Sequence, residues 1–230
     1  MTTKKNPETN TIILVSPLSL MMLTVVVEGF PGSNFLSACP PPNFVLDLLE
    51  ASNDKARRDA NPTETGTKEN KRSIRDPDVE YENSMYRNSN GEHCHLSVAY
   101  KKGLSCATRR VQHKDMTKVL IDGAVHVDGG AEGLIPIRFK SVKRNDAAAV
   151  NNSMRGAPAA VPVFKAEYIE WEATLHILFD NNNISATDII NLLNIAGWYS
   201  GIGSRRPEKN GGAYGRYRVA AQRKMTAEAI

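Results

Sequence analysis

The sequence predicts an α+β fold, in which a ferredoxin-like antiparallel sheet is backed by helices and carries long inserted loops or hairpins. Three observations lead to this prediction. Residues 169–179 alternate apolar with mostly polar side chains, as a strand with one buried face does. A helical pattern with a capping box follows at 185–197, and short apolar runs broken by glycines precede the strand at 117–139.

Length and composition bound the organisation of the chain. Its 230 residues suit one domain, 1–230, with a sizeable core. With 41% hydrophobic and 23% charged residues, it is neither disordered throughout nor embedded in a membrane. Residues 51–90 hold sixteen charged and only eight apolar side chains, which predicts a charged insertion. The polar segment within 139–165 favours a second insertion, a hairpin or finger.

The uncharged segment 11–27 supports two interpretations. It follows two lysines as a signal peptide would, and the sequence at 36–39 resembles the cleavage box of a bacterial lipoprotein. Pro17 interrupts the apolar run, however, and the β-branched residues at 23–27 lead to Gly29, which is typical of a buried strand. We favour the strand, and with it a cytoplasmic protein without membrane association, and the signal segment remains the alternative.

The other elements are expected in this order along the chain. Asn43 caps a short helix at 44–49, and Ser97 caps a helix that runs to about Val111 and turns Val98 inward. Gly197 closes the helix that begins after Ser185. Short strands are expected at 119–121, 124–127, 134–139 and 214–220.

The net charge of +4 is unevenly distributed. Residues 204–224 carry seven basic side chains against Glu208 alone, so a polyanion is the expected partner of this end of the chain. Five glycines in 201–218 permit a nest of backbone N–H groups for phosphate, and Tyr214 and Tyr217 offer ring faces for bases. The segment is neither a P-loop nor a Rossmann fingerprint. The alternative is a flexible, solvated hairpin loop.

Two motifs carry a resemblance to a known family. The run Gly201-Ile202-Gly203-Ser204-Arg205-Arg206 follows a helix and leads through a glycine-aromatic stretch into a strand. It resembles the glycine-rich loop of the RAMP superfamily, which holds Cas7-, Cas5- and Cas6-like RNA-binding proteins of CRISPR systems and related phage-encoded proteins. The segment from His95 to Leu104, with Arg109 downstream, is similar to a helix start of Cas7-like members, although Leu96 replaces a proline there.

The resemblance implies that the single domain has an RRM-like fold. It also implies a non-catalytic, self-assembling subunit that holds a guide or target strand by its phosphates. The expected partners are single-stranded RNA (DNA is possible), further copies of the chain in an oligomer or filament, and other effector subunits. No cofactor and no metal are expected. The residues expected to bind nucleic acid are Lys101, Lys102, Arg109, Gly201, Gly203, Ser204, Arg205, Arg206, Lys209, Tyr214, Gly215, Arg216 and Tyr217.

Two other functions remain open. A Cas6-like endoribonuclease would need a general base, for which His95 and His113 are the candidates. A phage or secreted structural protein would bind no nucleic acid. Trp171 is expected in the core and His176 on an exposed face, because of their phase in the strand pattern.

Overall fold

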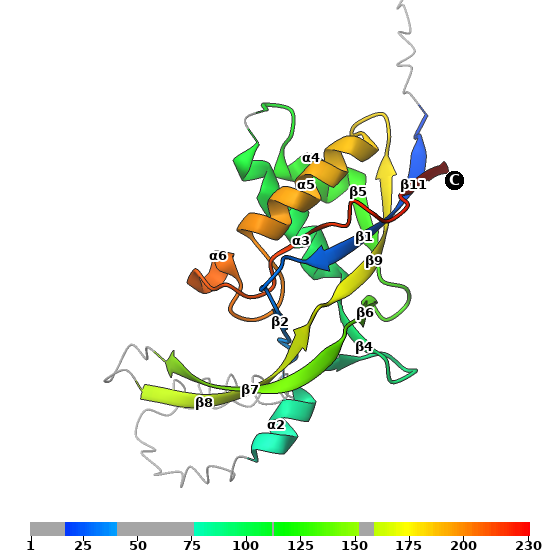
Figure 1. Cartoon of the computed structure of the whole chain (residues 1–230). Coiled ribbons are helices and arrows are strands. Elements are labelled where there is room, and N and C mark those ends of the chain that lie inside the picture. The colour runs from blue at the N-terminus through cyan, green and yellow to red at the C-terminus, as the bar shows by residue number, and fades with distance from the viewer. Residues whose placement is uncertain (1–16, 41–75, 112, 152–158) are drawn as a thin grey trace, which may run out of the picture.

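The computed structural model describes residues 17–40, 76–111, 113–151 and 159–230. Within them, a large antiparallel sheet has the strand order β10-β1-β9-β6-β4-β3, with β11 paired to β1 and β5 to β9 (Figure 1). The strands are β1 (Leu20–Gly29), β3 (Tyr86–Arg87), β4 (His93–Leu96), β5 (Val125–Asp128), β6 (Leu134–Arg138), β9 (Glu172–Asp180), β10 (Tyr217–Val219) and β11 (Thr226–Ala229). The predicted α+β class is confirmed.

Helices cover one face of this sheet (Figure 1). They are α3 (Ser97–Ala107), the short 3-10 helix η1 (Thr108–Arg110), α4 (Lys118–Ala124) and α5 (Ala186–Tyr199). On β1, Leu23, Val25 and Val27 point to the helices and are buried. Because alternate residues of a strand face opposite sides, Thr24 and Val26 lie on the other, outer face. The sheet therefore has a core side and an outer side with different chemistry.

The start of α5 follows the predicted capping box. The Ser185 hydroxyl accepts a hydrogen bond from the Asp188 backbone N–H at 3.2 Å, and the Asp188 carboxylate accepts one from the Ser185 N–H at 3.3 Å. This exchange satisfies donors that the first turn of a helix would otherwise leave free. The predicted apolar stripe of α5 is buried, with members Ile189, Leu192, Leu193 and Ala196.

A second sheet, β2-β8-β7, extends away from the helices (Figure 1). It consists of β2 (Phe35–Leu36), β7 (Ser141–Asn151) and β8 (Ala159–Ile169). β7 and β8 pair antiparallel along their whole length, which makes a long hairpin. The hairpin lies where the sequence predicts one, at 139–165, and its status as an insertion stays a prediction.

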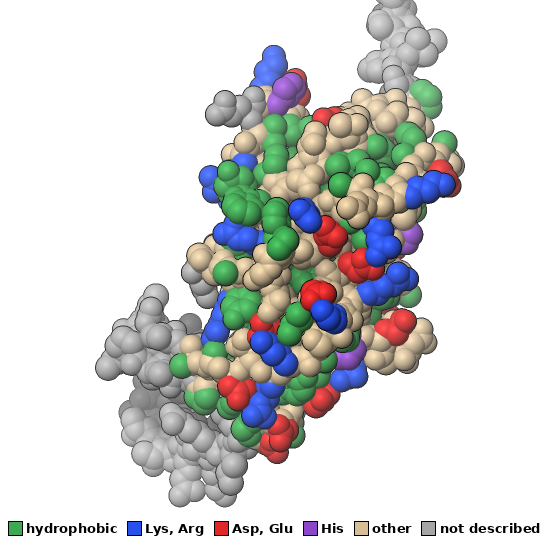
Figure 2. Space-filling view, in the orientation of Figure 1, with side chains coloured by type: hydrophobic (Ala, Val, Ile, Leu, Met, Phe, Trp, Pro, Cys, Tyr) green, Lys and Arg blue, Asp and Glu red, His purple; other side chains and the backbone are tan. Residues whose placement is uncertain are grey.

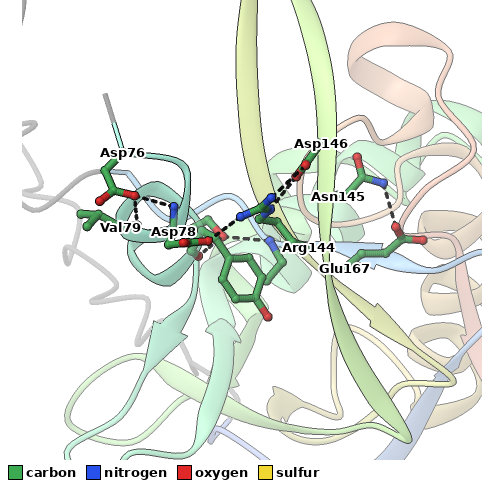
Figure 3. A network of polar contacts seen from close by, with 10 residues as sticks. Asp76, Asp78, Val79, Arg144, Asn145, Asp146 and Glu167 are labelled. Atoms are coloured by element: carbon green, nitrogen blue, oxygen red, sulfur yellow. Dashed lines mark hydrogen bonds and ion pairs between the residues drawn. The ribbon is translucent and has the colours of Figure 1, made fainter. Parts of the chain in front are cut away.

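Helix α2 (Pro77–Asn83) is tied to the hairpin by ion pairs. Asp76 caps the helix by accepting a hydrogen bond from the Asp78 backbone N–H at 2.9 Å. Arg144 of β7 pairs with Asp78 and, at 2.8 Å, with Asp146 (Figure 3). Carboxylates therefore neutralise the arginine of the hairpin that faces α2.

The second half of the uncharged N-terminal run is β1, in the middle of the large sheet. It pairs with β9 from Leu20↔Asp180 to Glu28↔Glu172, and with β10 and β11 on its other side. This position agrees with the strand interpretation of 23–27, while residues 11–16 lie outside the described ranges. None of the described helices has the length and apolar character needed to cross a bilayer.

The predicted strand 169–179 is wrong at its start. Ile169 is the last residue of β8, and Glu170 has a φ of 50°, which turns the chain before β9 begins at Glu172. Trp171 is buried, as predicted, but it lies in the corner between β8 and β9. Its burial continues the apolar alternation of β9, and the strand was therefore predicted to start too early. The Gly29 N–H donates to the Trp171 carbonyl at 2.9 Å, which fixes this corner against β1.

Two predictions near α3 and α4 are also wrong. Residues 119–121 are helical because the Thr117 hydroxyl caps α4 by accepting from the Leu120 N–H at 3.1 Å. Ser97 is the first residue of α3 and not its cap, and Val98 is exposed. The apolar pattern of so short a run is the same in a strand and in a buried helix, so it did not reveal the Thr117 cap that makes 119–121 helical.

The C-terminal elements differ in their bounds. α5 continues through Gly197 to Tyr199, and a Cβ at Gly197 would collide with the Tyr217 carbonyl, so this glycine permits close packing and does not end the helix. The last predicted strand shortens to β10, and β11 was not predicted. The predicted helix at 44–49, and the part of the predicted insertion before residue 76, lie outside the described residues.

Candidate nucleic-acid interface

The glycine-rich loop after α5 is tightly packed. Gly203 has a φ of 74°, and a Cβ there would collide with the Leu36 carbonyl and the Phe35 ring. Its φ lies in the region that glycine enters without steric cost. The glycines thus hold the loop against β2, so the alternative of a flexible, solvated loop is wrong for this part of it.

The backbone N–H groups of the loop are largely engaged inside the protein. Ile202 donates to the Gly215 carbonyl at 2.9 Å, and Ser204 donates to the Leu36 carbonyl at 2.8 Å. Gly215 donates to the Asn34 carbonyl at 2.8 Å. These donors form no open phosphate nest, and the loop can hold an anion chiefly through its basic side chains.

Basic side chains fall into two sets within the described ranges. One set forms ion pairs with carboxylates: Arg87, Lys118, Arg138, Lys140, Lys143, Arg144, Arg206, Arg218 and Arg223. The other set has no described carboxylate within 4 Å and includes Lys102, Arg109, Arg110, Lys165, Arg205, Lys209 and Arg216. These seven residues lie around the glycine-rich loop, in three adjoining places. Lys101, Lys114 and Lys224 also have no described carboxylate within 4 Å, but they line neither cleft at the loop.

The first place is a cleft between the start of α3 and the glycine-rich loop, with a volume of about 240 Å³, which we call the helix cleft. Lys102 of α3 is its unpaired cation, and Gly201 and Gly203 line it as well. Arg206 and Glu208 also line this cleft, and they pair with each other at 3.3 Å. The two motifs that carry the family resemblance are about a hundred residues apart in the sequence. The fold brings them to opposite walls of this cleft.

The second place is the corner where the loop meets the hairpin. The Lys165 ammonium of β8 donates to the Ser204 hydroxyl at 2.8 Å. Burial, and then the neighbouring Arg205 and Lys209, lower the pKa of Lys165. Like charges lower the pKa of an ammonium because they disfavour its charged form, so the part of the shift that follows burial reflects the two neighbouring cations.

The third place is a cleft of about 530 Å³ on the far side of the loop, which we call the arginine cleft. Its cations are Arg109, Arg110 and Arg216. Two exposed aromatic residues at the end of α5, Trp198 and Tyr199, line it as well. Neither aromatic residue was among the predicted binding residues, although both directly precede the glycine-rich loop and Trp198 lies out of phase with the buried stripe of α5.

Lys101 has a different role from the one expected. Its ammonium donates to the carbonyls of Ile121 at 2.6 Å, Asp122 at 3.2 Å and Val125. These carbonyls lie at the C-terminal end of α4, where a helix leaves acceptors unsatisfied. Lys101 therefore joins α3 to α4 and does not face the cleft with Lys102.

The two tyrosines that were predicted to stack on bases, Tyr214 and Tyr217, differ in their exposure to solvent. Tyr217 is fully buried, and its ring meets those of Tyr100 at 5.8 Å and Trp171 at 6.4 Å between centroids. Burial raises the pKa of its phenol well above the usual value. Tyr214 is partly exposed, and its hydroxyl lies 3.4 Å from the Asn145 amide nitrogen. Tyr217 is a core residue with no free ring face.

The two histidines considered as general bases lie in different surroundings. His95 is only 3% exposed, neither ring nitrogen has a hydrogen-bond partner, and its ring packs 4.8 Å from that of Phe35. Burial, and then Arg206, lower the pKa of His95 to about 3. His113 is exposed, with its Nδ1 4.0 Å from the Asp115 carboxylate. A base with so low a pKa is weak, because general base catalysis works best with a pKa near the working pH.

Within the described ranges, no group of three or more His, Cys, Asp or Glu side chains is placed to hold a metal ion. His176 is exposed, as expected, and its Nδ1 lies 3.1 Å from the Thr24 hydroxyl on the outer face of the sheet.

Taken together, the fold and these clefts define an RRM-like α+β protein with unpaired cations around a glycine-rich loop. The chain is similar in structure to one chain of the cryo-EM structure of the Type III-B Cmr-beta bound to cognate target RNA, with a TM-score of 0.52 and 9% sequence identity. The match covers 92% of this chain and 61% of that chain, so this protein spans about three fifths of its length. At this identity the likeness concerns the fold. No family model and no curated protein sequence matches the chain.

Proposed function

We propose that this protein binds single-stranded RNA in a nucleoprotein complex, as a Cas7-like, non-catalytic subunit. The RNA lies along the glycine-rich loop, with its phosphates held by the cations of the helix cleft and of the Lys165 corner. The observation that carries this proposal is the gathering of unpaired cations from α3, η1, β8 and the loop on one side of a molecule whose other cations are mostly paired.

The electrostatics support this assignment over a structural role. Unpaired cations that lower the pKa of a neighbouring lysine cost free energy unless an anion offsets their repulsion. A chain of phosphates offsets it at several points, and condensed counterions leave the RNA when it binds. The fold likeness to a chain of an RNA-bound structure agrees with an RNA partner.

Self-assembly is the second part of the proposal. Copies of the chain stack along one RNA, and the β7–β8 hairpin of each copy separates groups of bases. The hairpin is suited to this because it projects from the body of the protein and joins it beside the cationic corner (Figure 1). Other effector subunits are the further partners of such an assembly.

The test is a salt titration of binding to labelled single-stranded RNA. Because about six cations would meet phosphates, the logarithm of the binding constant is expected to fall with the logarithm of the salt concentration at a slope of about −4. K102A/R205A/K209A is expected to lower the affinity about 100-fold at low salt and to flatten the slope by about two. The matched control R138A/R218A/R223A removes the same charge from paired arginines and is expected to change the affinity less than about threefold.

Two results would overturn the proposal. A flat salt response of the wild-type chain would exclude phosphate clamping. Equal losses in the two triple variants would mean that net charge, and not this site, governs binding. For self-assembly, electron microscopy or native mass spectrometry with long single-stranded RNA is expected to show stacked copies, and monomers alone on saturated RNA would contradict it.

A further inference from the structure

The end of α5 presents two aromatic side chains to solvent. Trp198 is 46% exposed and Tyr199 is 49% exposed, although both follow the buried stripe of the same helix. Tryptophan and tyrosine are enriched at binding interfaces, and these two rings line the arginine cleft together.

The indole of Trp198 is held in place by three contacts. The Arg216 guanidinium lies over the indole at 4.4 Å from its centroid. Arg216 also donates a hydrogen bond from Nη1 to the Trp198 carbonyl at 3.0 Å. The Phe30 ring meets the indole edge-on, at 5.2 Å between centroids and 67° between planes. A ring positioned in this way loses little conformational entropy when a ligand stacks on it.

Tyr199 has a similar partner. The Arg110 guanidinium lies 5.0 Å from the centroid of its ring. The cleft thus pairs each exposed ring with an arginine that has no described carboxylate partner, and Arg109 adds a third such cation. The single carboxylate that lines it, Glu208, lies 3.3 Å from Arg206, in an ion pair.

We propose that the arginine cleft is a base-stacking subsite, in which one unpaired base of the RNA stacks on Trp198 or Tyr199. The neighbouring phosphate then meets Arg109 and Arg110. The inference rests on the proposed function, because it concerns where the same RNA passes after the glycine-rich loop. Ring faces beside guanidinium groups are the chemistry that reads unstacked bases without sequence preference.

A protein partner is the competing occupant, since tryptophan, tyrosine and arginine also dominate binding hot spots. The cleft favours RNA because its cations outnumber its one carboxylate, which is already paired. Its remaining lining is mostly small or polar, with Cys106, Ser200 and Gly211, and lacks the apolar core of a protein interface.

Tryptophan emission tests the subsite directly, because the chain has two tryptophans and Trp171 is only 2% exposed. A short oligouridine is expected to quench the wild-type emission, whereas W198F keeps only the buried indole and its emission is expected to stay constant. Inorganic polyphosphate, which offers the backbone charge without bases, is expected to bind without quenching. W198A is expected to weaken oligouridine binding about tenfold, and V119A, a change at an exposed apolar side chain of α4, is expected to leave it unchanged.

The outcomes separate the two proposals. Tight, salt-dependent oligouridine binding without quenching, with equal affinity in W198A, would overturn the subsite and leave the proposed function standing. Failure of the wild-type chain to bind oligouridine at low salt would overturn both. A lower oligomeric state of W198A, with RNA affinity unchanged, would assign the cleft to a protein partner instead. W198F keeps a ring at this position, so it serves where W198A loses its fold, which circular dichroism would reveal.

Discussion

The two sides of the large sheet use arginine in different ways. On the outer side, Arg138 and Arg223 both pair with Glu172, at 3.8 and 3.0 Å, and Arg218 pairs with Glu28 at 2.9 Å. On the helical side, Arg216 and Arg110 lie over aromatic rings, and no described carboxylate pairs with either. Arg218 also lies over a ring, 5.7 Å from the centroid of Phe30, but it has Glu28 as a partner. Figure 2 shows one face of the molecule, on which basic and acidic side chains are interspersed toward the lower right.

The difference matters because RRM-like proteins commonly bind RNA on the open face of the sheet, through aromatic side chains. Here the outward positions of β1 and β9 hold no Phe, Tyr or Trp, and Thr24, Thr174 and His176 stand among them. These outward positions of the two central strands therefore offer neither a stacking ring of this kind nor an unpaired cation. The helical side has both, which is why we assign the RNA to the loop and its clefts.

The largest expected effect comes from reversing charge on each side separately. R109E/R110E/R216E and R138E/R218E/R223E change the net charge equally, so the difference between them reports location. The first variant is expected to bind single-stranded RNA at least about 100-fold more weakly than the second, because repulsion acts at the phosphates themselves. Fluorescence anisotropy at fixed salt measures this, and equal losses would erase the distinction between the two sides.

The next largest expected effect is on the stability of G197A, which adds a methyl group at Gly197. This variant tests whether α5 packs tightly against β10 on the helical side. A Cβ there meets the Tyr217 carbonyl, so G197A is expected to lower the free energy of unfolding by about 3 kcal/mol. Gly123 of α4 has no atom within 4 Å of an added Cβ, so G123A is expected to leave stability unchanged or to raise it by up to about 1 kcal/mol. Denaturant titration compares them, and a neutral G197A would mean that the packing is loose.

His95 provides a pH dependence on the helical side. Its pKa of about 3 in the folded protein lies below its usual value of 6.5, so the unfolded chain binds a proton first as the pH falls. Its contribution is fully present above pH 6.5 and is lost toward pH 3, at a slope of up to about 1.4 kcal/mol per pH unit. H95F, which keeps a ring beside Phe35, is expected to lack this part of the slope. If the wild-type chain and H95F lose the same stability between pH 6.5 and pH 3, a group other than His95 causes the acid sensitivity.

The smallest effect is expected on the outer side. E172A breaks two ion pairs between partly exposed side chains, and such pairs contribute less than about 1 kcal/mol to stability. Thermal unfolding at low and high salt checks this value. A loss of stability well above about 1 kcal/mol in E172A would show that these ion pairs contribute more than is usual for exposed pairs.

Much of the fold follows from local patterns in the sequence. The alternation of residues 173–179 and the capping box at Ser185 each specify one element, and both are present in the structure. The predictions were wrong where a contact with a part of the chain distant in sequence determines where an element begins or ends. Glu170 turns the chain at a corner fixed by β1, and Gly197 stays in α5 because β10 packs against it.

The candidate site was less predictable for the same reason. The basic residues of the loop are evident in the sequence, but which tyrosine is buried depends on packing, and Tyr217 lies in the core while Trp198 is exposed. Lys101 and Lys102 are neighbours in sequence, yet only the fold shows that Lys101 caps α4. Exposure and pairing of charges are tertiary properties, which residue spacing does not encode.

Photocrosslinking of thiouridine-containing single-stranded RNA, followed by mass spectrometry of the linked peptides, tests the location of the RNA most directly. We expect the crosslinks to fall in 102–110, 198–199 and 204–216, around the glycine-rich loop and the arginine cleft. Crosslinks confined to the outward positions of β1 and β9, 22–28 and 172–178, would contradict the account.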